Sequence, residues 1–181
     1  MRHYIRNYVP GGTFFFTVVT YQRRRMLTDA LARSTLRSAL RQVRARWPFD
    51  IIAIVLVPDH LHTVWSMPEG EADYSLRMQK VKETFTKQFL ASGGTAAIPT
   101  ASEAFHGQRG IWQPRFWEHT VRDEGDLKRC LDYVHWNPVK HGLIRRVRDY
   151  PWSSFHRYVR LGEYAGDWGA EDPCPGLEMP E

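Results

Sequence analysis

Cysteines and long apolar runs are both scarce in this chain, and their scarcity excludes several classes of protein. The 181 residues include two cysteines, Cys130 and Cys174, which form neither a disulfide framework nor a Cys-x-x-Cys metal site. No apolar run reaches the length of a transmembrane helix. Residues 14–19 are too short a run for the core of a signal peptide, and arginines follow at 23–25. We therefore expect a cytoplasmic protein with reduced thiols and no membrane partner.

Acidic residues are nearly absent from the first quarter of the chain, whereas basic residues are absent from its end. Residues 1–48 contain a single acidic residue, Asp29, and no lysine. Arginines therefore carry all the positive side-chain charge of this segment at pH 7. Residues 161–181 contain no lysine or arginine and carry six acids. The net charge is +5 and the sequence pI is about 9.4. A basic surface of this kind predicts a polyanionic partner, of which nucleic acid is the commonest.

Hydrophobic periodicity predicts seven main elements. Aromatic and β-branched residues at 13–20, the apolar runs at 51–57 and 61–66, and residues 111–121 are typical of strands. Apolar residues at helical spacing predict helices over 29–47, 74–90 and 123–137. Pro48 and Pro138 are expected to end the first and third of these helices. The run at 51–57 has the pattern of a strand buried on both faces.

The predicted order is β-α-β-β-α-β-α, which favours an α+β fold. A split β-α-β layout of this kind is ferredoxin-like, with an antiparallel sheet and helices on one face. We expect one domain over residues 1–150 and a C-terminal extension over 151–181 that ends in the acidic tail.

Two histidines flank one leucine at the start of the third predicted strand. In a strand, residues i and i+2 lie on the same face, so His60 and His62 would present their imidazoles side by side. Two imidazoles can hold one divalent metal ion, and such an ion can polarise a phosphoryl oxygen. The spacing alone is a weak signal, because surface and core histidines often share it.

The last predicted helix carries a tyrosine and an amide one turn apart. Tyr133 and Asn137 stand at i and i+4, so they share a helix face. A phenolate is a nucleophile that can stay covalently attached to phosphorus. The Asn137 carbonyl oxygen could complete the coordination shell of a metal held by His60 and His62. Read alone, the Tyr–Asn pair usually means packing.

Arginines at helical spacing form a stripe on the first predicted helix, at Arg33, Arg37, Arg41 and Arg44. This stripe is either a solvated face or a contact to a DNA backbone, and the sequence leaves both readings open. Arg115 lies within an aromatic cluster and is a candidate for phosphate or base contact. His135 and His141 flank the end of the tyrosine helix and are interpreted as structural or DNA-contacting.

Several of these segments together resemble a known family. His60-Leu61-His62 matches the His-hydrophobe-His signature of HUH single-strand endonucleases. Residues 132–143 (DYVHWNPVKHGL) are similar to the tyrosine-helix motif of REP-associated tyrosine transposases. The segments 8–17, 111–119 and 150–154 resemble the same family, and the likeness extends over roughly residues 4–168. The related mobile-element transposases have glutamine where this chain has Asn137.

The resemblance implies a ferredoxin-like domain with a specific chemistry. His60, His62 and Asn137 would bind Mg²⁺ or Mn²⁺, and Tyr133 would attack a DNA phosphorus to form a 5′-phosphotyrosine and release a 3′-hydroxyl. The substrate would be single-stranded DNA folded into REP hairpins. The enzyme would be a transposase that cleaves and rejoins such DNA, nucleoid-associated in the cytoplasm, as a monomer or a homodimer.

Two other readings of the residues compete with this one. A two-histidine phosphoesterase needs a second copy of its His-x-Thr motif, and His62-Thr63 has the wrong spacing. A non-catalytic, ferredoxin-like nucleic-acid-binding module would use Phe14, Phe15 and Phe16 as a stacking platform. That module leaves the histidines and Tyr133 unexplained.

Overall fold

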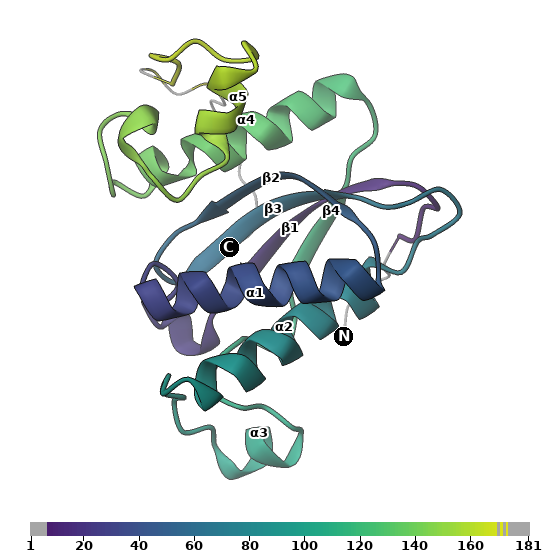
Figure 1. Cartoon of the computed structure of the whole chain (residues 1–181), viewed down its shortest axis with the longest axis vertical. Helices are drawn as coiled ribbons and strands as arrows, with labels where there is room; N and C mark the ends of the chain where they lie inside the picture. The colour runs from purple at the N-terminus through teal and green to yellow at the C-terminus, as the bar shows by residue number, and fades with distance from the viewer. Residues whose placement is uncertain (1–6, 170, 172, 174–181) are drawn as a thin grey trace.

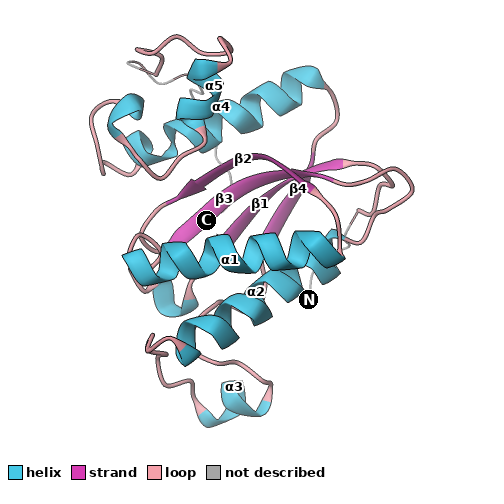
Figure 2. Cartoon of the chain, viewed as in Figure 1, coloured by secondary structure: helices cyan, strands magenta, loops and turns pink. Residues whose placement is uncertain are grey.

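The computed structural model describes residues 7–169, 171 and 173, and its secondary structure follows the predicted order (Figures 1 and 2). Four strands form one sheet: β1 (Thr13–Val19), β2 (Asp50–Leu56), β3 (His60–Ser66) and β4 (Trp117–Thr120). The helices are α1 (Ala30–Arg46), α2 (Tyr74–Ala91), α3 (Ala101–Phe105), α4 (Glu124–Lys140) and α5 (Phe155–Arg160), with 3-10 turns η1 (Tyr21–Arg23) and η2 (Val147–Asp149).

The sheet is antiparallel, with the strand order β2-β3-β1-β4. Helix α1 connects β1 to β2, and the segment that contains α2 connects β3 to β4, so each connection passes over a neighbouring strand. This is the split β-α-β topology of a ferredoxin-like fold. The α+β class and the antiparallel sheet expected from the sequence are confirmed.

Helices cover both faces of the sheet rather than one, which corrects part of the sequence-based expectation. Helices α1 and α2 pack on the face that carries Phe14 and Phe16. Helix α4 lies on the opposite face of the sheet (Figure 2). It packs there against Phe15 and Val64. The reason lies in β1, where all three consecutive phenylalanines have no exposed surface. Because side chains alternate along a strand, burying all three requires a layer on each face.

Two predicted boundaries are also corrected. Helix α4 does not end before Pro138 but continues to Lys140. A proline in the last turn lacks its own backbone N–H, yet the next turn still forms, with the N–H of His141 donating to the carbonyl of Asn137 at 3.0 Å. The last strand is shorter than predicted and spans Trp117–Thr120, preceded by an isolated bridge between Thr20 and Trp112.

Strand β2 is an outer strand of the sheet, and the chain that follows Tyr150 covers its edge. The N–H of Leu56 donates to the carbonyl of Trp152 at 2.9 Å, and the N–H of Ser154 donates to the carbonyl of Ile54 at 2.8 Å. The predicted full burial of this strand is therefore wrong, since Ile54 and Leu56 are only half-buried. Backbone pairing explains why an apolar strand can lie at this position.

Beyond the pairing segment, α5 packs against η2 and Tyr164 in a small apolar cluster. The end of the predicted acidic tail, residues 174–181, lies outside the described residues. Among the helices of the described part of the chain, none combines the length and apolarity that a membrane crossing requires.

Candidate active site

The two histidines of β3 lie on the face of the sheet that α4 covers. His60 and His62 have 1% and 0% of their surface exposed, and their ring centroids are 4.8 Å apart. The predicted placement of both imidazoles on one strand face is thus observed. In the antiparallel pairing of β1 with β3, His62 stands opposite Thr17 and His60 opposite Val19.

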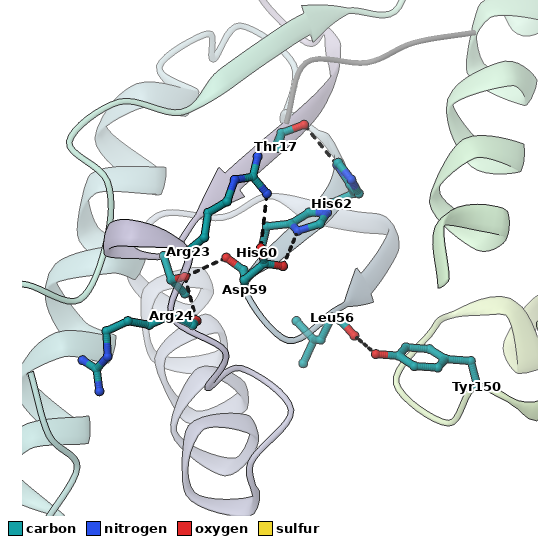
Figure 3. Close-up of polar contacts among 9 residues, drawn as sticks. Thr17, Arg23, Arg24, Leu56, Asp59, His60, His62 and Tyr150 are labelled. Atoms are coloured by element: carbon teal, nitrogen blue, oxygen red, sulfur yellow. Dashed lines mark hydrogen bonds and ion pairs between the residues drawn. The ribbon is translucent and has the colours of Figure 1, made fainter. Parts of the chain in front are cut away.

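Oxygen atoms orient both imidazoles through Nδ1 (Figure 3). Nδ1 of His60 is 2.8 Å from Oδ1 of Asp59, and Nδ1 of His62 is 3.0 Å from the hydroxyl oxygen of Thr17. A carboxylate only accepts hydrogen bonds, so Nδ1 of His60 carries the proton and donates. The lone pair of that ring then lies on Nε2, which is buried on the side away from Asp59. A carboxylate that holds a histidine in this tautomer is typical of metal-ligating histidines.

Asp59 belongs to a turn that is itself tied down. Its Oδ2 accepts a hydrogen bond from Nη1 of Arg23 at 3.2 Å (Figure 3). Its backbone carbonyl accepts a hydrogen bond from the hydroxyl of Thr20 at 2.8 Å. Burial acts to raise the pKa of Asp59, but the hydrogen bonds from His60 and Arg23 and the charge of Arg23 outweigh burial and lower it. The carboxyl group is therefore ionised and remains a strong acceptor for the imidazole.

Tyr133 projects from α4 onto the same face of the sheet. Its ring packs edge-on against His62, with centroids 5.2 Å apart, and against Phe15 at 5.9 Å. The residue is 1% exposed. Nζ of Lys140, seven residues later, donates a hydrogen bond to the phenolic oxygen at 2.8 Å. An ammonium group at this distance stabilises negative charge on the phenolic oxygen.

The last two turns of α4 bring further polar groups over the histidines. His141, at the end of the helix, has its ring centroid 5.0 Å from that of His60. Asn137 lies one helical turn from Tyr133 and one turn from His141, is fully buried, and has a buried Oδ1. Nε2 of both histidines on β3 and Oδ1 of Asn137 on α4 are all buried, and imidazole nitrogens and amide oxygens are donors that can hold a divalent cation.

Two residues near the phenol and the imidazoles were absent from the sequence-based site. Lys140 and His141 contact Tyr133 and His60, whereas the sequence predicted only Tyr133 and Asn137 from this helix. Helical spacing could have indicated both, because Lys140 stands two turns from Tyr133 and His141 one turn from Asn137. Because the helix was expected to end at Pro138, the sequence did not place Lys140 and His141 on the same helix as Tyr133 and Asn137.

His135 points away from this cluster. Its Nε2 lies 3.0 Å from the hydroxyl oxygen of Ser154, and its ring packs against those of Tyr158 and Tyr164. Burial, aided by the positive charges of Arg157 and Lys128, lowers the pKa of His135 to about 3. His135 is therefore neutral at physiological pH, and its contacts are structural.

The predicted DNA-contacting arginines lie away from Tyr133. Helix α1 carries Arg33, Arg37, Arg41 and Arg44, and it covers the face of the sheet opposite α4. Arg44 is partly engaged, because its guanidinium donates to the carbonyl of Phe49 at 2.7 Å and to Asp50 at 3.1 Å. Arg115 is exposed in the segment that precedes β4. A role of these residues in DNA binding stays a prediction.

A second group of potential metal ligands lies between β4 and α4. Ligand atoms of His119, Asp126 and Cys130 all lie within 4.8 Å of one another. The Asp126 carboxylate already accepts from Nε2 of His119 at 2.8 Å, from the N–H of Arg122 at 3.0 Å and from Arg129 at 3.2 Å. Burial alone would raise the pKa of Asp126. These hydrogen bonds outweigh that effect, so the pKa of Asp126 is lowered. This network anchors the start of α4 to β4.

Known proteins resemble this chain over most of its length. The family model described as "Transposase IS200 like" matches residues 11–137. The REP-associated tyrosine transposase of Escherichia coli K12 is 40% identical over 171 residues, which cover 94% of this chain and 93% of that protein. A Haemophilus influenzae protein assigned to the same group is 40% identical over 176 residues, which cover 93% of this chain and 94% of the relative.

A solved structure agrees with these sequence relatives. It is described as a REP-associated tyrosine transposase bound to a REP hairpin, and it matches with a TM-score of 0.78 and 38% sequence identity over 100% of both chains. The match therefore includes β3 and α4, which carry the histidine pair and the tyrosine. The chain belongs to the IS200-like transposase family and, within it, to the REP-associated tyrosine transposases.

Proposed function

We propose that this transposase is a metal-dependent endonuclease that cleaves and rejoins REP-type hairpin DNA through a 5′-phosphotyrosine intermediate. The observation that carries the proposal is the contact of Tyr133 with both the ammonium group of Lys140 and the ring of His62. Its phenolic oxygen lies 2.8 Å from Nζ of Lys140, and its ring packs on His62. The hairpin substrate is inferred from the relative that was solved with a REP hairpin.

Tyr133 is the nucleophile in this proposal. Its phenolic oxygen attacks the phosphorus of the scissile phosphodiester as the phenolic proton is lost, and the bond from phosphorus to the 3′ oxygen breaks. The leaving 3′ oxygen takes up a proton, which yields a free 3′-hydroxyl and a DNA 5′ end linked to Tyr133. Attack of a 3′-hydroxyl on the phosphotyrosine reverses these steps and rejoins DNA, so the reaction needs no external energy source.

Lys140 assists this step by stabilising the developing charge. Tyr133 is buried against Phe15 and His62, where an isolated phenolate would be poorly solvated. The ammonium group supplies a charge-assisted hydrogen bond to the oxygen that must become nucleophilic. The same contact holds the ring in one orientation, which favours a single line of attack.

The residues around Tyr133 fit a divalent metal, Mg²⁺ or Mn²⁺. The ligands would be Nε2 of His60, Nε2 of His62 and Oδ1 of Asn137, three buried atoms from adjoining elements. The carboxylate of Asp59 fixes the tautomer of His60 that leaves Nε2 as a ligand, and the hydroxyl of Thr17 occupies Nδ1 of His62, so Nε2 is the nitrogen of that ring left for a metal. When bound, such an ion would polarise the phosphoryl oxygen and offset the charge of the phosphate.

The non-catalytic binding module is disfavoured by one feature of the sheet. Phe14, Phe15 and Phe16 have no exposed surface, because helices cover both faces. An RNA- or DNA-binding sheet of the ferredoxin-like kind needs exposed aromatic rings on which bases can stack.

We assign catalysis to the domain over residues 1–150, with residues 151–181 as an extension. The protein would act at the nucleoid as a monomer or homodimer.

A cleavage assay with a labelled hairpin tests this function. The oligonucleotide carries a REP hairpin with single-stranded flanks and a label at its 3′ end, and it is incubated with protein in Mg²⁺, in Mn²⁺ or in chelator. The proposal predicts a labelled fragment that migrates with the protein on a denaturing gel, in the metal-containing samples only. Cleavage that leaves both DNA ends free, or equal cleavage in chelator, would contradict it.

A further inference from the structure

A groove runs along α1 on the face of the sheet opposite Tyr133. It has a volume of about 520 Å³ and lies between α1, the outer face of β2 and the segment that follows Tyr150. Its floor is apolar and its rim is basic. The apolar side chains are Leu36, Leu40, Ile51, Ile54 and Leu56, and the basic ones are Arg33, Arg37, Arg41 and Arg44. None of the described residues that line the groove is acidic.

An indole ring closes the groove at one end. The guanidinium carbon of Arg33 lies 3.4 Å from the ring centroid of Trp152, so the guanidinium covers one face of the ring. Trp152 is nevertheless 37% exposed, so part of its indole surface remains accessible. Nε of Arg33 is buried and makes no hydrogen bond to any residue that the structure describes.

The backbone around Trp152 is fixed by the edge of the sheet. Leu56 donates its N–H to the carbonyl of Trp152, and the backbone and hydroxyl of Ser154 bond both polar groups of Ile54. The hydroxyl of Tyr150 donates to the carbonyl of Leu56 at 2.6 Å (Figure 3). An exposed ring on a backbone fixed in this way is a preorganised contact surface.

The groove is separate from the candidate active site but lies near it. Alternation along β2 directs Ile54 and Leu56 toward the groove, whereas Val55 packs in the core beneath α4. Leu56 pairs with Leu61, the residue between the two histidines. The end of the groove that Trp152 forms thus adjoins the edge of the sheet at the level of the histidine pair.

We propose that this groove binds single-stranded DNA, with the α1 arginines on phosphates and an unpaired base stacked at Trp152. The proposal rests on the proposed function, since it supplies a second contact for the same substrate. A basic rim with an apolar floor and one exposed aromatic ring is the combination by which proteins hold unpaired strands. Bases in a duplex are stacked and paired, so their faces are not available to Trp152. The single-stranded flank of a hairpin therefore fits the groove better than its stem.

The test measures binding of a short fluorescein-labelled oligothymidylate by fluorescence anisotropy, with the full chain and without added metal. This probe reports neither hairpin recognition nor cleavage, so its result is independent of the cleavage assay described above. Trp152→Ala should weaken binding by roughly 5- to 150-fold, the effect of losing one base–aromatic stack. Trp152→Phe should keep most of the affinity, because it keeps a ring. Thermal melting shows whether each variant is folded.

The arginines are tested by the dependence of affinity on salt. Changing Arg33, Arg37 and Arg41 together to glutamine should lower the slope of log affinity against log salt by about 2, at about 0.7 for each contact to a single strand. Arg46→Gln is the matched control, because it removes the same charge from the same helix at a side chain that packs over Trp47, outside the groove. It should leave affinity and slope nearly unchanged.

Three outcomes would overturn the proposal. The first is wild-type binding of oligothymidylate by Trp152→Ala. The second is a loss in Arg46→Gln as large as the loss per arginine in the triple variant. The third is an equal loss by Trp152→Ala on a blunt duplex of the same length, which would assign the groove to duplex DNA.

Discussion

Lys140 gives the sharpest prediction about how the fold assists the reaction. Lys140→Met removes the ammonium group but keeps an unbranched side chain of similar length on the last turn of α4. The hydrogen bond that it removes spans 2.8 Å and ends at the phenolic oxygen of Tyr133. Hydrogen bonds that involve a charged group contribute about 1.5–3 kcal/mol, which corresponds to roughly 10- to 150-fold in rate if the contact acts in the transition state. Because Lys140 is exposed, we expect the lower end, about tenfold.

The assay is single-turnover cleavage of the labelled hairpin, with DNA affinity measured separately. We expect a slower chemical step with nearly unchanged affinity, and partial recovery in Lys140→Arg, which keeps a cation. Lys128→Met is the matched control. It lies on the same helix and removes the same charge, but its ammonium group bonds the carboxylate of Asp132 at 3.0 Å instead of the phenol. Wild-type cleavage by Lys140→Met, or equal slowing by Lys128→Met, would refute the assigned role.

Three further predictions concern the ligands, their support and the edge of the sheet. His60→Ala should abolish metal-dependent cleavage while Asn137→Ala reduces it less, as measured by cleavage across a Mn²⁺ titration; the reverse ranking would contradict the ligand set. Asp59→Ala should weaken metal affinity, measured by calorimetry, by about 10- to 100-fold, because His60 loses the carboxylate that orients its ring. Unchanged affinity would show that Asp59 does not orient the ring. Tyr150→Phe should lower the free energy of unfolding in urea by about 1 kcal/mol, since it deletes the hydrogen bond to Leu56, and a neutral effect would argue against that bond.

The elements and half of the site follow from local periodicity. Strand alternation alone places His60 and His62 on one face, and helical spacing alone places Tyr133 one turn from Asn137. The strands β1 to β3 and the helices α1, α2 and α4 were all predicted within a few residues of their observed positions. Patterns of this kind depend only on neighbours in the sequence, which is why the sequence reveals them.

The remaining features depend on contacts between distant segments. Three consecutive phenylalanines in β1 imply that both faces of the sheet are covered. An apolar run does not show that α4 is the helix that covers the second face. The pairing of residues 152–154 with β2 is made by backbone groups and a single serine hydroxyl, which leave no hydrophobic pattern to read. The contact of His141 with His60 requires that α4 continue past Pro138, against the usual effect of proline.

The role of Tyr133 as the nucleophile is tested most directly by locating the covalent bond between protein and DNA. Wild-type protein is incubated with the hairpin and metal, the adduct is digested with protease and nuclease, and the modified peptide is identified by mass spectrometry. We predict a nucleotide joined through its 5′ phosphate to Tyr133, and no adduct in a folded Tyr133→Phe variant that still binds the hairpin. An adduct on another residue, a 3′ linkage, or cleavage by Tyr133→Phe with a protein-linked end would contradict it.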